Sequence, residues 1–238
     1  MIKGENIVES INSELDKAVY GNNTDAQAEM WKYANISTPT VRIVGKKILK
    51  KLEGYGFDDM DSLLEICDEL LATKAWPHRI IAFQWSFKFR KDFEPRHFPI
   101  FERWVKKHVT GWGSCDDLCT HTVGYFILEY PQFIPKVKQW VNSDNPFVRR
   151  AAAVSFIYAL RKGKLFEHVF DVADALLNDE DKYVLKGYGW MLKVSSKHYQ
   201  DEIFEYVMEN KARMPRLSLR YAIEKMPESL RKKAMASP

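Results

Sequence analysis

The segment NPFVRRAAAVSF, residues 145–156, has the same pattern as a later segment, DKYVLKGYGWML, residues 181–192. Three pairs of residues match at an offset of 36: Val148 with Val184, Arg150 with Lys186, and Val154 with Trp190. This offset is close to the roughly 40–47 residues of helical-hairpin repeats, in which a helix pair buries its apolar face only by stacking on its neighbours. The pattern therefore predicts a stacked array of helix pairs.

Residues 144–156 also resemble the HEAT-repeat consensus, in which an aspartate leads into Val-Arg and small apolar residues. We therefore predict an all-α fold: a right-handed superhelical solenoid of antiparallel helix pairs, of HEAT-like or ARM type, with a concave basic cleft. No linker or low-complexity segment divides the sequence. Residues 1–238 are accordingly predicted to form a single domain, with the last few residues disordered.

Helical spacing recurs along the whole chain. Residues 38–51 separate an apolar face from a face rich in lysine, and Thr38 before Pro39 predicts a helix N-cap. Thr24 and Gln27 form a capping-box pattern. Further helices are predicted at about residues 58–73, 78–90, 97–109, 115–129, 131–141, 146–161, 164–177, 181–195, 199–210 and 216–225.

The composition narrows the class of protein. Hydrophobic residues make up 46% of the 238 residues, which is enough for a packed core. No apolar run approaches the roughly 20 residues that cross a bilayer, and the polar N-terminus has no signal-peptide core. We therefore expect a cytoplasmic protein without a membrane partner. Three cysteines in a chain of this length do not indicate a disulfide framework.

The formal net charge of +4 permits nucleic-acid binding, and the placement of the basic residues is more informative. On stacked helices, basic residues at matching repeat positions would form a stripe suited to a phosphate backbone. The alternative for each of them is an ordinary solvated surface position. The candidates are Arg149, Arg150, Lys186, Lys193, Lys197, Arg213, Arg216 and Arg220.

The segment GWGSCDD, residues 111–117, places Trp112 four residues before Asp116. On a helix the two side chains share a face. Trp112 could instead be a core residue, and Asp116 could simply favour the start of a helix through the helix dipole. The remaining tryptophans are assigned to core packing: Trp31, Trp76, Trp85, Trp104 and Trp140.

Four segments together resemble the AlkD-type DNA alkylation-repair glycosylases, which are HEAT-like repeat proteins. They are GWGSCDD, SDNPFVRRAAAVSF, KGYGWMLKVSSK and MPRLSLRYAIEKMP, which span residues 111 to about 227. The sequence departs from this family's pattern at two places. Gly113 follows Trp112 where many members have Asp, and the region around residues 31–40 is shorter.

The resemblance implies an enzyme of base excision repair that removes cationic N3- or N7-alkylated purines from double-stranded DNA without flipping the base. By this resemblance Asp116 is the catalytic carboxylate, Trp112 and Trp190 are the cleft tryptophans, and Arg150 holds the DNA backbone. Arg149, Lys186 and Lys193 are assigned to DNA binding. A monomer is expected, with the protein on the nucleoid when bound to DNA.

These residue types suit that chemistry. Loss of a cationic purine moves positive charge onto the sugar, so a carboxylate such as Asp116 stabilises the transition state. Arg150, if close, would favour ionised Asp116. The electron-rich indole faces of Trp112 and Trp190 attract a cation, and Arg150 could grip a phosphate.

Other functions remain open. A non-catalytic HEAT-type module that binds DNA structures or a protein partner is the main alternative to an enzyme. Cys115, Cys119 and His121 could be a metal site, or a thiol with its base, but a second pair of ligands is not evident. We therefore expect no metal and no cofactor.

Overall fold

The computed structural model describes residues 7–20, 33, 36–54 and 59–236, with only the backbone described at Val19 and Tyr20. The chain divides into two compact units, residues 1–93 and residues 94–238. The predicted capping box of Thr24 and Gln27 lies outside the described residues, as does Trp31.

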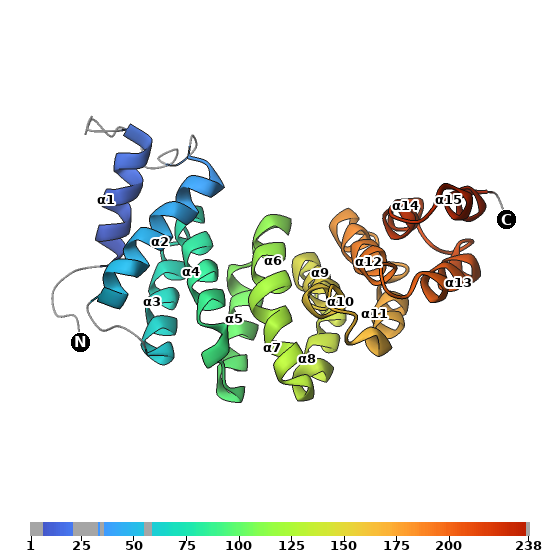
Figure 1. Cartoon of the computed structure of the whole chain (residues 1–238), viewed down its shortest axis with the longest axis horizontal. Helices are drawn as coiled ribbons and strands as arrows, with labels where there is room; N and C mark the ends of the chain where they lie inside the picture. The colour runs from blue at the N-terminus through green and yellow to red at the C-terminus, as the bar shows by residue number, and fades with distance from the viewer. Residues whose placement is uncertain (1–6, 21–32, 34–35, 55–58, 237–238) are drawn as a thin grey trace. The chain divides into compact units, whose positions relative to one another are not determined.

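The first unit is built from four described helices, which Figure 1 labels in chain order. They are α1 (Ile7–Tyr20), α2 (Thr38–Gly54), α3 (Met60–Ala72) and α4 (Trp76–Lys88), followed by a 3-10 turn at Arg90–Asp92. Helix α4 packs against both α2 and α3. At the α2–α4 contact the indole Nε1 of Trp85 donates to the carbonyl of Gly45 at 2.9 Å, which satisfies both buried polar groups.

The second unit contains the longer series of helices. They are α5 (Phe98–His108), α6 (Trp112–Leu118), α7 (Gly124–Glu129), α8 (Ile134–Lys138), α9 (Pro146–Val154), α10 (Ile157–Leu160), α11 (Val169–Leu176), α12 (Lys182–Ser195), α13 (Gln200–Asn210), α14 (Arg216–Ile223) and α15 (Glu228–Met235). A π turn at Cys119–Val123 joins α6 to α7, so residues 112–129 form one interrupted helix. Short 3-10 turns begin at Pro95, Pro131, Gln139 and Phe166.

The all-α prediction is confirmed, since every regular element in the described part of the chain is helical. Several predicted boundaries change. The predicted helix 146–161 is interrupted between α9 and α10, and the predicted helix 131–141 contains only five α-helical residues between 3-10 turns. Helices α1 and α15 were not among the predicted ranges. The predicted concave basic cleft and single domain stay predictions.

The N-cap prediction at Thr38 was wrong by one residue. Thr38 is already helical, and the hydroxyl of Ser37 accepts a hydrogen bond from the backbone N–H of Thr40 at 3.3 Å. Serine and threonine are both favoured N-cap residues, and here the Ser37 hydroxyl binds the backbone N–H of Thr40, which has no partner within the helix. Position 38 is then free to enter the helix.

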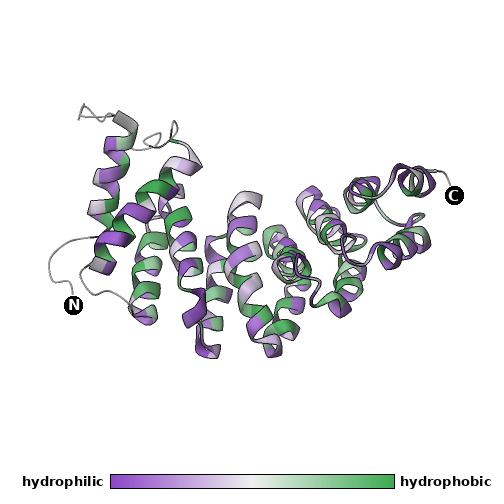
Figure 2. Cartoon of the chain, viewed as in Figure 1, coloured by the Kyte–Doolittle hydropathy of each residue, from purple (hydrophilic) through white to green (hydrophobic). Residues whose placement is uncertain are grey.

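Apolar residues face the neighbouring helices in both units, and hydrophilic residues take the opposite faces (Figure 2). The predicted core tryptophans Trp85, Trp104 and Trp140 are buried, and Trp76 is half-buried. In the described part of the chain, no helix combines the length and the apolar character needed to cross a membrane.

Two glycines of the segment KGYGW let α12 lie close to helices on both of its sides. A Cβ on Gly187 would lie 3.0 Å from Cγ of Arg150 in α9. A Cβ on Gly189 would lie 2.8 Å from the carbonyl oxygen of Ser218 in α14. Between them the hydroxyl of Tyr188 donates to Oγ of Ser218 at 2.5 Å. Helix α12 makes its most extensive contacts with α14 and α9 for this reason.

We predict that Gly189→Ala lowers the free energy of unfolding by about 1–3 kcal/mol, because the added methyl group forces α12 and α14 apart. Denaturant unfolding monitored by circular dichroism measures the change. Gly113→Ala in α6 is the matched control, since a Cβ there has no atom within 4 Å. Helix propensity alone then makes the control up to about 1 kcal/mol more stable. Equal stability changes in the two variants would contradict the packing argument.

Candidate active site

The first residues of α6 set the position of Trp112. Gly111 is fully extended, with φ of −174°, a conformation open to any residue. The hydroxyl of Ser114 accepts from the N–H of Gly111 at 3.2 Å and donates to its carbonyl at 2.9 Å. This local bonding starts the helix at Trp112. Neither Gly111 nor Gly113 has an atom within 4 Å of an added Cβ, so close packing does not require either glycine.

Trp112 is exposed, with 56% of its surface accessible. Together with Ile43 it is one of two large hydrophobic side chains that the described residues leave exposed. The alternative that Trp112 is a core residue is therefore wrong. Asp116 follows one turn later on α6, and its side chain is 20% exposed. The helix thus presents an indole to solvent above a mostly buried carboxylate.

Arg150 of α9 holds this carboxylate by two parallel hydrogen bonds. Its Nε donates to Oδ1 of Asp116 at 2.8 Å, and its Nη2 donates to Oδ2 at 2.9 Å. Its Nη1 donates to the carbonyl of Tyr183 in α12 at 2.5 Å. The Arg150 side chain is only 6% exposed, and the missing side chain of Gly187 provides the space beside it. The guanidinium therefore orients Asp116 and does not face solvent.

Opposing effects act on the pKa of Asp116. Burial raises it above its ordinary value, and the negative charge of the adjacent Asp117 acts in the same direction. The hydrogen bonds and the charge of Arg150 lower it, but by less than burial and Asp117 together raise it. Arg150 thus favours the ionised form, as expected from the sequence, while the net pKa shift is upward.

Three other predicted site residues, Lys186, Trp190 and Lys193, lie on α12. Trp190 is half-buried. Nζ of Lys186 lies 6.0 Å from the centre of the Tyr221 ring, and Nζ of Lys193 lies 5.3 Å from the same ring. Lys193 is also paired with Glu224 at 2.9 Å. Within the described residues, Trp190 makes no hydrogen bond or ring contact with Trp112 or Asp116, so the structure brings together only Asp116 and Arg150 directly.

Arg149 binds a different carboxylate from Arg150. Its Nε and Nη2 donate to the carboxylate of Asp179 at 2.6 and 3.1 Å. Its Nη1 donates to the carbonyls of Ser143 and Asp144 at 2.9 and 3.1 Å. This residue ties the start of α9 to the loop before α12.

The π turn after α6 adds contacts that the sequence did not reveal. The hydroxyl of Thr120 donates to the backbone carbonyl of Asp116 at 2.8 Å, and Nδ1 of His121 lies 3.0 Å from the carbonyl of Asp117. The i to i+5 bonding of a π turn frees carbonyls for such side chains. The sequence pattern predicted one continuous helix at about residues 115–129, so it did not reveal this turn.

The cysteines beside the site are packing residues. Cys115 and Cys119 are fully buried, and Sγ of Cys115 lies 3.4 Å from the carbonyl of Phe147. Burial raises the pKa of the Cys115 thiol well above its ordinary value, which opposes a role as nucleophile. Among the described residues, no three or more His, Cys, Asp or Glu side chains cluster in a way that could hold a metal ion.

Comparisons with known proteins bear on the family and the fold of the chain. The family model for DNA alkylation repair enzyme matches residues 14–226. A solved structure described as a predicted DNA alkylation repair enzyme from Enterococcus faecalis is similar, with a TM-score of 0.71 and 17% sequence identity. The match covers 87% of this chain and 97% of that one. At this identity the likeness shows the fold alone. The search among curated proteins found no match.

We predict that Arg150→Met lowers the free energy of unfolding by about 2–4 kcal/mol at neutral pH, because it leaves a mostly buried carboxylate without its partner. It also raises the pKa of Asp116 further, since both lowering interactions are lost. Lowering the pH towards 4 shifts the carboxyl towards its uncharged form, more so because its pKa is raised, so the loss of stability shrinks. Urea unfolding at the two pH values measures this.

The double variant Arg150→Met with Asp116→Asn is the control. It has no ionisable group at position 116, so the pH dependence specific to Arg150→Met should disappear. If Arg150→Met were equally destabilising at both pH values with Asp116 present, the ion pair would not govern the stability of this region.

Proposed function

Because the chain belongs to the DNA alkylation repair enzyme family, we propose that it is a DNA glycosylase of base excision repair. The family gives the chain a role in DNA repair. The proposed reaction is hydrolysis of the N-glycosidic bond of cationic N3- or N7-alkylated purines in double-stranded DNA. The observation that supports it is the exposed indole of Trp112 one helical turn from a carboxylate fixed by Arg150.

The chemistry needs a negative charge near the sugar. In an N7-alkylated purine the base is already cationic, so when the C1′–N9 bond breaks both electrons leave with a base that becomes neutral. The sugar becomes oxocarbenium-like, and a nearby carboxylate stabilises it electrostatically. A water molecule then attacks C1′ and loses a proton. In this proposal ionised Asp116 faces the sugar and accepts that proton, and its raised pKa makes it a better base.

Arg150 acts in this proposal through Asp116. Both carboxylate oxygens accept from the same rigid guanidinium, which fixes the orientation of the group before substrate binds. Contact of Arg150 with the DNA backbone, expected from the resemblance, is not part of this proposal, because its guanidinium is buried and bonded to Asp116 and Tyr183. Arg149, which is engaged with Asp179 and backbone carbonyls, is likewise not a DNA contact in this proposal.

The remaining site residues bind DNA in this proposal. Trp112 packs on the lesion nucleotide, and its exposure suits a duplex approaching from solvent better than a flipped base in an enclosed pocket. Trp190, Lys186 and Lys193 present an aromatic and basic surface of α12 to the same duplex. The enzyme is proposed to act as a monomer in the cytoplasm, on the nucleoid when bound to DNA, without metal or cofactor.

A non-catalytic DNA- or protein-binding module is the second candidate. The same bidentate pair favours it, because a carboxylate held by arginine is also a common structural contact between helices. In that case Asp116 stabilises the fold, and binding does not depend on its charge. Measurement of base release separates the two candidates.

We predict that the protein releases 7-methylguanine from methylated double-stranded DNA, and that Asp116→Asn lowers the rate constant about 10²–10³-fold, because the amide lacks the negative charge. Chromatography of released bases under single-turnover conditions measures the rate. DNA binding, measured by fluorescence anisotropy, should stay within a few-fold of the wild type.

Asp117→Asn is the matched control, since it removes the same charge from the next residue. It should keep most of the activity. Release by the wild type no faster than spontaneous loss would contradict the proposed function. Equal losses in the two variants would contradict the assignment of Asp116.

We predict that Trp112→Ala lowers the rate of release about 2- to 30-fold, which corresponds to a cation–π contribution of roughly 0.5–2 kcal/mol. Because Trp112 is exposed, its replacement should change the free energy of unfolding by less than about 0.5 kcal/mol. Ile43→Ala, at the other exposed large hydrophobic residue, is the control and should leave release unchanged. Similar losses in both variants would show a general effect of surface hydrophobicity.

A further inference from the structure

A pocket of about 560 Å³ lies beside the C-terminal end of α12, and neither Asp116 nor Arg150 lines it. Its described lining contains four basic side chains and no carboxylate. The basic residues are Arg161, which follows α10, Lys193 and Lys197 at the end of α12, and Lys225 after α14. Trp190 forms part of the wall. The pocket therefore combines an aromatic surface with a concentration of positive charge.

The four positive charges are unequally compensated. Glu224, at the end of α14, accepts from Lys193 at 2.9 Å and lies 3.7 Å from Nζ of Lys225. This contact lowers the pKa of Glu224, which stays ionised between the two lysines. Neither Arg161 nor Lys197 has a carboxylate partner among the described residues. Two exposed cations thus face a pocket without a counter-charge, which favours an anionic ligand.

The residue types in the lining indicate which kind of anion fits the pocket. Trp190 and Val194 give the pocket an apolar side, next to the cations. A simple inorganic anion has no apolar group that could pack against Trp190 and Val194. A nucleotide unit has both parts: a phosphate for the guanidinium and ammonium groups, and a deoxyribose or base that packs on an indole.

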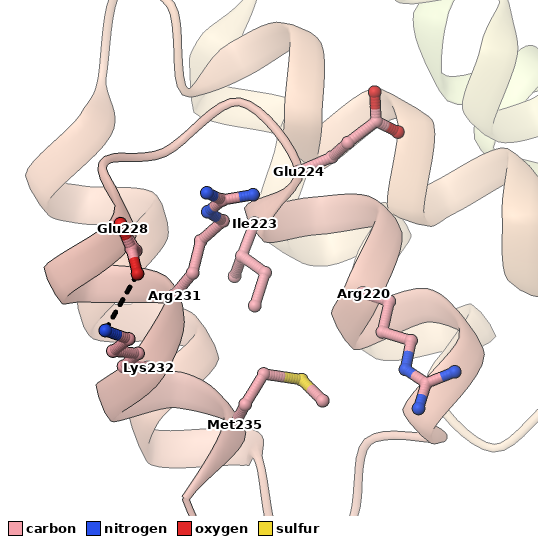
Figure 3. A pocket seen from close by; sticks show the side chains of 7 residues that line it. All are labelled: Arg220, Ile223, Glu224, Glu228, Arg231, Lys232 and Met235. Atoms are coloured by element: carbon pink, nitrogen blue, oxygen red, sulfur yellow. Dashed lines mark ion pairs between the residues drawn. The ribbon is translucent and has the colours of Figure 1, made fainter.

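A second pocket of the same unit differs from this one in the charges of its lining. It lies between α14 and α15, with a volume of about 400 Å³, and Ile223 and Met235 contribute to its apolar lining (Figure 3). Its rim carries both signs of charge, and Glu228 is paired with Lys232 at 2.7 Å, the dashed line in Figure 3. Carboxylates at the rim repel a phosphate. The pocket at the end of α12 is therefore the better anion site.

We propose that the pocket at the end of α12 binds a phosphodiester of the DNA strand. Arg161 and Lys197 contact the phosphate, and Trp190 packs against the adjoining deoxyribose or base. This inference rests on the proposed function for the identity of the polymer, because a free nucleotide offers the same chemistry. It assigns to Trp190 a role in gripping the strand, and separates that role from the charge stabilisation by Asp116.

The salt dependence of binding to an undamaged duplex tests the proposal. Each phosphate contact adds about 0.9 to the slope of log K against log salt concentration, measured between about 50 and 200 mM. Arg161→Gln and Lys197→Gln should each reduce the magnitude of the slope, and the double variant, which loses the whole contact with this phosphate, should reduce it by about 0.9. Lys164→Gln removes an exposed lysine that is near in sequence but outside the pocket, and should leave the slope unchanged.

Glu224→Gln provides a test in the opposite direction. It releases Lys193 and Lys225 from their carboxylate, so the duplex should bind more tightly and the slope should become steeper. Equal slopes for Lys164→Gln and Arg161→Gln would overturn the proposal, since only the general charge would then matter. Unchanged or weaker binding by Glu224→Gln would also count against it.

Binding of deoxyadenosine monophosphate, measured by calorimetry, distinguishes the two sources of the ligand. If this nucleotide binds and Arg161→Gln abolishes the binding, while duplex slopes do not change, the pocket serves a free nucleotide and the DNA proposal is overturned. None of these measurements needs base release. A failure of the glycosylase assay with the predicted slopes intact would therefore overturn the proposed function alone.

Discussion

The contact between Arg150 and Asp116 joins three helices of the second unit. Arg150 extends from α9, takes both oxygens of a carboxylate on α6, and donates its remaining Nη1 to a carbonyl of α12. A guanidinium so deeply buried is stable here because each of its three nitrogens donates a hydrogen bond and its charge is paired with Asp116. Gly187 is part of the same contact, since a side chain there would occupy the space of the Arg150 stem. The register of α6, α9 and α12 thus depends on this one arginine.

The same contact decides what the carboxylate can do. Burial raises the pKa of Asp116, whereas the arginine lowers it and holds its two oxygens in one orientation. A fixed, partly desolvated carboxylate interacts more strongly with a developing positive charge than a solvated one. Its partial exposure next to the open face of Trp112 leaves a path for substrate. A structural ion pair and a catalytic carboxylate are therefore compatible in one group.

Three sides of helix α12 have different neighbours. Gly187 faces Arg150 and Gly189 faces α14, so two sides of the helix are used for close packing. The side between them carries Lys186, Trp190 and Lys193. Glu224 of α14 restrains Lys193 and leaves the uncompensated charge at Arg161 and Lys197, where the proposed phosphate contact lies.

The sequence alone determined the helical class, most helix positions, and the pairing of Trp112 with Asp116 on one face, because these depend on local periodicity and spacing. The sequence did not determine which basic residues lack an ion-pair partner within the protein. Arg149 and Arg150 are neighbours in sequence, and both were expected to contact DNA. Only the tertiary structure shows that each meets a carboxylate about 30 residues away, Asp179 and Asp116 respectively. Ion pairs between distant residues have no local sequence signal, and they decide which charges remain for a ligand.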